Sequence, residues 1–215
     1  MERLSTTNSV QELQRKLYLK AKSEPKFRFY ALYDKVYRTD VLSLAYSKVE
    51  ENKGGSGIDG EGFEEIEKEG KENVLKEIGR RLKEGTYKPS SVRRVYISKS
   101  NGGKRPLGIP TIRDRVVQMA VKLIIEPIFE ADFENNSYGY RPNKSAQQAV
   151  LETRKFLNRG YKEIIEVDIK DCFGTIPHRE LLDIIASRIV DRKILRLINP
   201  TCNFYEKYRG GLDFN

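Results

Sequence analysis

The residues best suited to chemistry lie in the stretch EIIEVDIKDCFGTIPH, residues 163–178, where an apolar run ends abruptly in an acid. The run predicts a buried strand that stops at Asp168, and Asp171 follows three positions later. A carboxylate at a strand end can bind a hard cation such as Mg²⁺, with the backbone carbonyl of Ile169 as a second oxygen ligand. An Asp that caps the next helix, or a surface acid, would give the same pattern. Asp168 by itself therefore does not predict a complete metal site.

A second group of chemically competent residues is a cluster of cations around a glycine turn. The sequence RRVYISKSNGGKR, residues 93–105, carries Arg93, Arg94, Lys99, Lys104 and Arg105. Arginine forks onto phosphate oxygens and lysine acts as a point charge, and glycine lets the backbone approach a ligand closely. Cations at a strand edge also discourage unwanted strand pairing. Five cations on one hairpin exceed that need, so the cluster predicts phosphate binding.

The charge of the whole chain fits a polyanionic partner. The 215 residues carry a net charge of +9, with nine Lys/Arg and one acid between residues 86 and 125 but eight acids and three lysines between residues 59 and 78. Such an asymmetry is typical of nucleic-acid binding, although ordinary surface charge is the alternative. His178 is the only histidine, which excludes His-based metal sites and Ser-His-Asp triads. Two cysteines are too few for a disulfide framework and suggest a reducing cytoplasm.

The elements that must position these residues follow from periodicity and caps. Alternation over residues 91–99 predicts a strand, SNGG predicts a turn, and KRPLGIP predicts a returning edge strand. Thr111 with Asp114, and Ser145, predict helix starts, while Pro127, Gly85 and Gly160 predict helix ends. No apolar run approaches the length of a membrane span, and no signal peptide is evident.

The N-terminal part reads as helices. Ser9 with Glu12 predicts a first helix that Pro25 ends, a second helix is expected to carry Phe29 to Val36, and Asp40 is expected to cap a third. NKGGSGIDG, residues 52–60, is a loop by its glycines. The order of helices, hairpin, helices, strand and helix predicts an α+β fold rather than regular βαβ units.

Together these motifs resemble the reverse transcriptases encoded by bacterial group II introns. The resemblance runs from about Leu32 to Ile198, in the family's order, through the hairpin, NSYGYRPNKS and VDIKDCFGTIPH; NKGGSGIDG is similar to the family's N-terminal motif. It implies an N-terminal helical extension with a template-lid loop over residues 1–85, fingers over residues 86–160 and the start of a palm over residues 161–215.

The resemblance also implies roles for individual residues. Asp168 matches the first catalytic aspartate, which with the Ile169 carbonyl binds Mg²⁺, and Phe173 matches the steric gate against a ribonucleotide 2′-OH. Lys99 and Arg105 match residues that grip the triphosphate of a dNTP. Nucleic-acid contacts are expected from a further set of cations, namely Arg93, Arg94, Lys104, Arg113 and Arg141.

The chain also departs from the family pattern. Gly174 stands where an Asp is usual, no two aspartates are adjacent anywhere, and residues 199–215 do not resemble the family's continuation. The Tyr-x-Asp-Asp motif and the thumb are therefore expected to be missing, as in a truncated fingers-and-palm piece. Because one aspartate cannot hold two Mg²⁺ ions in register, this chain alone is expected to bind RNA without polymerising.

The expected partners are intron RNA, an RNA template, a DNA primer and dNTP, with no membrane, in a cytoplasmic protein that serves intron splicing and mobility. Two alternatives stay open: a non-enzymatic RNA-binding maturase-like module, and a reverse transcriptase of a related bacterial lineage, either CRISPR-associated or diversity-generating. A Mg²⁺-dependent phosphohydrolase would need a second acidic cluster near Asp168.

Overall fold

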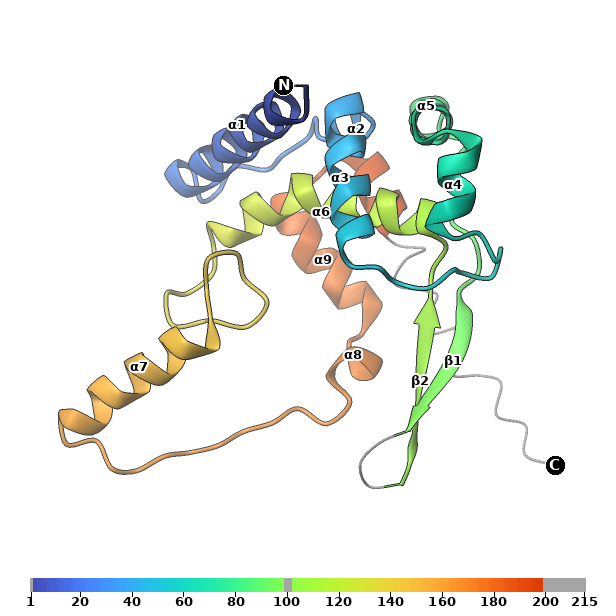
Figure 1. The fold of residues 1–215 in the computed structure, drawn as a ribbon. Coiled ribbons are helices and arrows are strands. Elements are labelled where there is room, and N and C mark those ends of the chain that lie inside the picture. The colour runs from blue at the N-terminus through green and yellow to red at the C-terminus, as the bar shows by residue number, and fades with distance from the viewer. Residues whose placement is uncertain (1, 99–101, 199–215) are drawn as a thin grey trace.

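A computed structural model describes residues 2–98 and 102–198, apart from the side chains of residues 2–6, 105, 173 and 174. The elements in chain order are α1 (Glu2–Ser23), α2 (Tyr33–Val36), α3 (Thr39–Glu51), α4 (Phe63–Glu69), α5 (Lys71–Glu84), β1 (Arg93–Ser98), β2 (Lys104–Ile109), α6 (Ile112–Glu130), α7 (Ala146–Asn158), α8 (Cys172–Thr175) and α9 (His178–Arg188). Residues 192–198 are also helical. Helices form the body and the hairpin projects from it (Figure 1), which confirms the α+β class.

The core lies where α6 packs across α1 and α3. Along α6 every fourth residue is buried, and the members of this row are at most 1% exposed: Ile112, Val116, Ala120, Ile124 and Ile128. Residues four apart share one helix face, so the sequence spacing itself creates this apolar ridge. Burial of each large aliphatic side chain contributes about 1.5–3 kcal/mol. Through this ridge α6 forms the centre of the core, against which α1 and α3 pack.

Helix α6 does not end at Pro127, contrary to the sequence expectation. It continues to Glu130, with Pro127 and Ile128 both buried. Proline lacks an N–H, so the carbonyl four residues earlier loses its helical partner. That carbonyl belongs to Leu123, and the side-chain amide of Gln14 on α1 donates to it at 2.9 Å. A tertiary hydrogen bond thus replaces the missing helical one and lets the helix pass through the proline.

The first helix also differs from the expectation, because it begins at Glu2 and Ser9 lies inside it. The Ser9 hydroxyl donates to Asp40 Oδ2 at 2.9 Å instead of capping a helix. Asp40 lies in the first turn of α3, which begins at Thr39, two residues earlier than an Asp40 cap would allow. Its carboxylate also accepts from Arg38 Nη2 at 2.6 Å. The capping residues expected at these two starts are therefore used to join α1 to α3.

The second expected helix is shorter than predicted, and Phe29 lies outside it. Phe29 forms an isolated parallel bridge with Ile189: its N–H donates to the Arg188 carbonyl and its carbonyl accepts from Val190 N–H, both at 2.8 Å. These bonds hold the residue extended and therefore outside a helix. The end of α9 is in this way tied back to the N-terminal helices.

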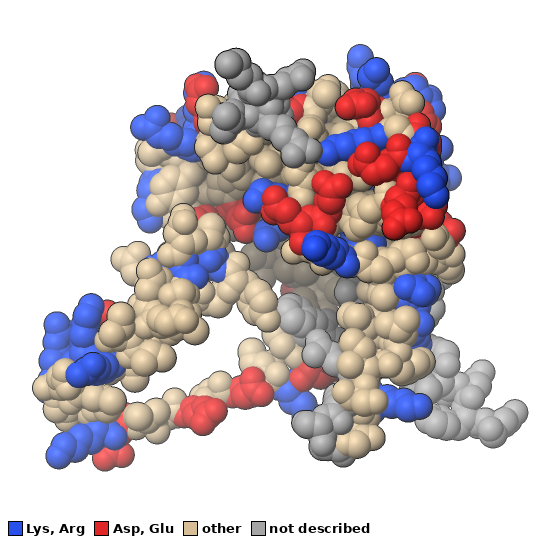
Figure 2. Space-filling model, in the orientation of Figure 1, with Lys and Arg blue, Asp and Glu red and all other residues tan. Residues whose placement is uncertain are grey.

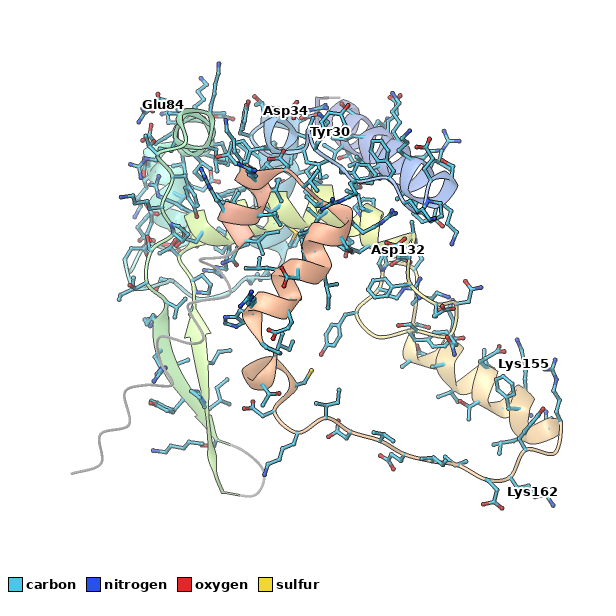
Figure 3. All side chains as sticks on the ribbon, turned by 180° about the vertical axis from the view of Figure 1, so that it is seen from behind. Tyr30, Asp34, Glu84, Asp132, Lys155 and Lys162 are labelled. Carbon is cyan, nitrogen blue, oxygen red and sulfur yellow. The ribbon has the colours of Figure 1, made fainter. Side chains whose placement is uncertain are left out.

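Arg188 strengthens the same junction. Its Nη1 donates to the Phe27 carbonyl at 3.1 Å, and its Nε lies 2.8 Å from Asp132 Oδ2, just beyond the end of α6 (Figure 3). Asp191 then receives the backbone N–H groups of Leu32 and Tyr33, each at 2.9 Å. Segments about 160 positions apart in sequence therefore share one set of hydrogen bonds.

Two parts of the chain lie outside this core. The hairpin pairs β1 with β2 antiparallel, from Arg93 opposite Ile109 to Ser98 opposite Lys104, and it projects from the body (Figure 1). Helix α7 starts after Ser145, as predicted, and Ser145 and Gln148 form a capping box there, yet none of the residues of α7 is buried. Figure 3 shows Lys155 on α7 and Lys162 beyond it at a distance from the helical core.

The strand expected to end at Asp168 is absent, and this expectation was wrong. Residues 161–169 have no regular secondary structure, and their apolar side chains are open to solvent, with Ile165 89% and Val167 83% exposed. A strand needs a neighbour that accepts and donates its backbone hydrogen bonds. The sheet in the described residues holds only β1 and β2, which pair with each other. Over the described residues, no helix is both long and apolar enough to cross a membrane.

Candidate nucleic-acid interface

The hairpin presents its cations to solvent. Arg93 and Arg94 on β1 and Lys104 on β2 are all exposed, and Figure 2 shows Lys and Arg side chains along the projecting hairpin. Arg105 lies on β2 opposite Ile97, although its side chain is outside the described part, and Lys99 lies wholly outside it. Because Arg93 and Lys104 are open to solvent, they can reach a bound polyanion without displacing packed side chains.

The base of the hairpin is anchored to α6 through a buried carboxylate. Asp114, only 4% exposed, accepts from the Tyr87 hydroxyl at 2.5 Å, the Ser90 backbone N–H at 3.0 Å and the Thr111 hydroxyl at 2.8 Å. Thr111 in turn caps α6, because its Oγ1 accepts from Asp114 N–H at 3.1 Å. Burial, together with the charge of Asp114, raises the pKa of Tyr87 well above its usual range. The phenol therefore stays a hydrogen-bond donor.

The glycine loop, residues 52–62, is pressed against the same turn of α6. A Cβ atom on Gly57 would lie 2.6 Å from the Thr111 Cα and 2.7 Å from its N, closer than any real side chain approaches. Arg115 Nη2 donates to the Gly55 carbonyl at 2.5 Å. The space between the loop and the helix at residue 57 is too small for any side chain larger than a hydrogen atom, which explains the glycine there.

Arg113 closes the other end of the glycine loop with two carboxylates. Its Nη2 lies 2.9 Å from Glu61 Oε1 and 2.5 Å from Glu69 Oε2. The hydrogen bond from Arg113 lowers the pKa of Glu61 below its usual value of 4.5. Arg113 is therefore charge-compensated in this structure, and its expected contact with nucleic acid stays a prediction.

Arg141 is likewise engaged within the protein. Its side chain is 6% exposed and its Nη2 lies 2.7 Å from Glu130 Oε1. Its Nη1 donates to the carbonyls of Glu134 at 2.6 Å and Ser137 at 2.7 Å. These bonds brace the turn that follows α6, so the role expected of Arg141 in binding nucleic acid also stays a prediction.

Asp168 is exposed in the segment that joins α7 to α8. Among the described residues its carboxylate has no hydrogen-bond or ion-pair partner, and no group of three or more His, Cys, Asp or Glu side chains comes together. A carboxylate and the Ile169 carbonyl are the oxygen donors that Mg²⁺ prefers, but two donors alone do not make a Mg²⁺ site. Phe173 lies in α8, with its side chain outside the described part.

Two features of this region were not anticipated from the sequence. The contacts of Gly57 and Arg115 join residues more than fifty positions apart, and only the cluster of glycines hinted at a close approach.

Asp171, which precedes α8, has a left-handed backbone with φ of 51°. Non-glycine residues adopt this conformation rarely, and Asp is among those that do so most readily. It places a sharp bend three residues after Asp168.

Comparison with known proteins gives a consistent result. A sequence model of the family described as reverse transcriptase (RNA-dependent DNA polymerase) matches residues 97–211. The match continues past Ile198, so the expectation that the family resemblance stops there was wrong. The group II intron-encoded protein LtrA of Lactococcus lactis subsp. cremoris is 42% identical over 176 residues, which cover 79% of this chain and 28% of the relative. The protein YkfC of Escherichia coli (strain K12) is 36% identical over 198 residues, 89% of this chain and 52% of the relative.

More distant similarity extends to other intron proteins. The mitochondrial nuclear intron maturase 1 of Arabidopsis thaliana is 30% identical over 98 residues, which are 46% of this chain and 14% of the relative. The chain thus spans 28% of LtrA and 52% of YkfC, well under two thirds of either protein.

Proposed function

This chain belongs to the reverse transcriptase family and is related over most of its length to the group II intron-encoded protein LtrA, and from that premise we propose that it binds a nucleic-acid strand and an incoming nucleotide as the fingers and initial palm of an RNA-directed DNA polymerase. The observation that carries the proposal is the hairpin. Its cations are exposed, and hydrogen bonds to Asp114 hold its base on α6. The glycine loop is bound to the same turn of α6, next to the hairpin. This arrangement suits a phosphate backbone.

Within this proposal each predicted residue keeps a role. Lys99 and Arg105 contact the triphosphate of a dNTP, and Phe173 excludes a ribose 2′-OH. Arg93, Arg94 and Lys104 contact the template–primer backbone through charge-assisted hydrogen bonds. Arg113 and Arg141 would have to exchange their present carboxylate partners before they could contact nucleic acid. We therefore expect these two arginines to contribute least to the affinity for nucleic acid.

The metal belongs to the proposal as well. Reverse transcriptases generally use divalent ions, and Asp168 with the Ile169 carbonyl would supply part of a Mg²⁺ site, where the ion would neutralise charge on phosphate oxygens. The remaining ligands would have to come from carboxylates outside the described residues. We therefore propose that this chain by itself binds RNA but does not extend a primer.

The biological setting follows from the relatives' names. We propose intron RNA and an RNA template as partners, a DNA primer as substrate, and a role in intron splicing and mobility in the cytoplasm. The similarity to the group II intron-encoded protein LtrA over most of the chain supports this choice over a non-enzymatic RNA-binding module or a reverse transcriptase of another bacterial lineage. The domain limits at residues 85 and 160 remain part of the proposal.

RNA affinity measured against salt tests the proposal. Cations that neutralise phosphates release counterions, so affinity should fall with a log–log slope of about −0.7 per contact on a single strand. We expect the variant Arg93→Gln/Arg94→Gln/Lys104→Gln to bind RNA more weakly. The slope of log affinity against log salt should become shallower by about 2, because three contacts are lost. The matched control, Lys68→Gln/Lys76→Gln/Lys83→Gln, removes the same charge from exposed positions on α4 and α5. It should leave the slope nearly unchanged.

Equal losses in the two triple variants would show that net charge, not the hairpin, determines binding. Salt-independent affinity would contradict phosphate contact altogether. Primer extension on an RNA template is the second measurement. Product formed by this chain and abolished by Asp168→Asn would show that its metal site is complete, contrary to our proposal.

A further inference from the structure

The first turn of α6, residues 111–115, contacts two separate functional segments at once. Thr111 meets the glycine loop through its backbone and the hairpin network through its hydroxyl. Arg113 and Arg115 bind the ends of the glycine loop, and Asp114 binds the residues that lead into the hairpin. The turn itself is rooted in the core by Ile112 and Val116, which are at most 1% exposed. It is therefore the part of the core that both segments contact.

On the loop side the contact is steric. Gly57 has no positive φ that would require glycine, yet any Cβ there would meet the Thr111 Cα at 2.6 Å. Backbone atoms cannot move aside as the end of a flexible side chain can, so the glycine loop would have to lift from α6. Lifting it would also break the 2.5 Å hydrogen bond between Arg115 and the Gly55 carbonyl.

On the hairpin side the contact is a chain of hydrogen bonds. A shift of Thr111 moves its hydroxyl, which donates to Asp114, and Asp114 in turn holds Tyr87 and the Ser90 N–H. The two segments also meet directly, because a Cβ on Gly55 would lie 3.6 Å from Arg93 Nη2. A displacement of the loop therefore reaches the hairpin base through only two residues of α6.

We propose that residues 111–115 are positioning residues that hold the glycine loop and the cationic hairpin as one unit, so that a polynucleotide strand on the loop and a nucleotide triphosphate on the hairpin bind cooperatively. The identity of these two ligands rests on the proposed function; the mechanical coupling rests on the contacts alone. Coupling between two sites is reciprocal: each ligand must raise the affinity for the other by the same factor.

Hydrogen exchange of the 215-residue chain tests the coupling without any ligand. In Gly57→Ala we expect faster exchange in residues 52–60 and also in residues 87–92, which include the Ser90 N–H. Gly139→Ala is the matched control, because Gly139 lies outside both segments, has no positive φ, and a Cβ there would meet nothing within 4 Å. It should leave both regions unchanged. Faster exchange of the loop alone, or of neither region, would overturn the proposal.

A second variant covers the case in which Gly57→Ala loosens the whole fold, which faster exchange of α3 would reveal. Arg115→Gln removes the donor to the Gly55 carbonyl without a backbone clash. It should again loosen residues 52–60 and 87–92 together while α3 keeps its protection. Loosening of residues 52–60 alone in this variant would refute the coupling.

A binding experiment gives the functional readout. With a single-stranded RNA oligonucleotide and dTTP as probes, RNA should raise dTTP affinity at least about 5-fold in the unaltered chain and in Gly139→Ala, since coupling factors usually span 5–150-fold. The factor should approach 1 in Gly57→Ala. An undiminished factor in Gly57→Ala would overturn the proposal. Failure of the unaltered chain to bind RNA would instead contradict the proposed function and leave the exchange result to decide the coupling.

Discussion

At the scale of single residues, a cation's partners decide what it can do. Arg113 and Arg141 have guanidinium groups within 2.9 Å of carboxylates, whereas Arg93 and Lys104 are exposed on the hairpin. A paired cation gives up an existing bond before it can contact a phosphate, whereas Arg93 and Lys104 have no ion-pair partner among the described residues to give up. Residue type alone therefore overstates the size of a basic interface.

Asp114 is the residue on which the hairpin support depends most. A buried carboxylate is costly unless several donors satisfy it, and Tyr87, Ser90 and Thr111 supply them. Removing one donor leaves part of that cost uncompensated.

Tyr87→Phe tests this dependence. It removes one donor and adds no bulk, so we expect the free energy of unfolding to fall by about 1–3 kcal/mol, measured by urea denaturation at pH 7. Tyr140→Phe is the control, because Tyr140 is 99% exposed and should change stability by less than about 0.5 kcal/mol. Equal effects in the two variants would mean that the phenol contributes nothing through Asp114.

At the scale of elements, a single carboxylate joins the two ends of the described chain. Asp191 Oδ2 accepts from the N–H groups that open α2, and its Oδ1 accepts from Lys193 N–H at 3.0 Å, at the start of the helical residues 192–198. One side chain thus caps two helix starts that are far apart in sequence. Caps of this kind offset the unpaired N–H groups of a first helical turn.

Loss of this double cap should be measurable. Asp191→Ala should destabilise the fold by about 2 kcal/mol, since single caps contribute about 0.5–2 kcal/mol each. Asp191→Asn keeps one acceptor oxygen and should fall between Ala and the unaltered chain in thermal or urea unfolding. Asp34→Ala, at an exposed acid in α2 (Figure 3), is the control. A loss in Asp191→Ala no larger than in Asp34→Ala would refute the double-cap role.

At the scale of the whole molecule, stability is concentrated in the packing of α1, α3 and α6. Helix α7 and residues 161–169 extend away from that core (Figure 1) and expose apolar side chains, among them Val150 at 67% and Ile164 at 73%. Asp168 lies in this open part. The candidate metal ligand is therefore attached to the least stabilised region of the described chain.

Substitution of two isoleucines, one in each region, tests this difference in stability between the core and residues 161–169. Ile165→Asn, at a side chain 89% exposed, should change the free energy of unfolding by no more than about 0.5 kcal/mol. Ile124→Ala, at a fully buried side chain of α6, should cost about 2–5 kcal/mol. Chemical denaturation of the two variants and of the unaltered chain measures both changes in the free energy of unfolding. A large loss in Ile165→Asn would show that residues 161–169 pack against the core in solution.

Local patterns were enough to predict several elements from the sequence. The hairpin strands, the Thr111 cap of α6, the helix start at Ser145 and the end of α5 at Gly85 were all predicted and are confirmed. Each depends on groups a few positions apart or on the alternation of one strand with its neighbour. The motifs that identify the reverse transcriptase family are likewise short and linear, and the similarity over residues 97–211 confirms them.

Only the tertiary structure decided the features that need a partner from elsewhere in the chain. Helix α6 passes through Pro127 because Gln14, 109 positions from Leu123, satisfies the freed carbonyl. Arg113 is compensated by Glu61, 52 positions away. The apolar run before Asp168 has strand character, but no described strand lies beside it to complete its hydrogen bonds. Side-chain chemistry and periodicity are properties of the sequence, whereas the availability of a partner is a property of the fold.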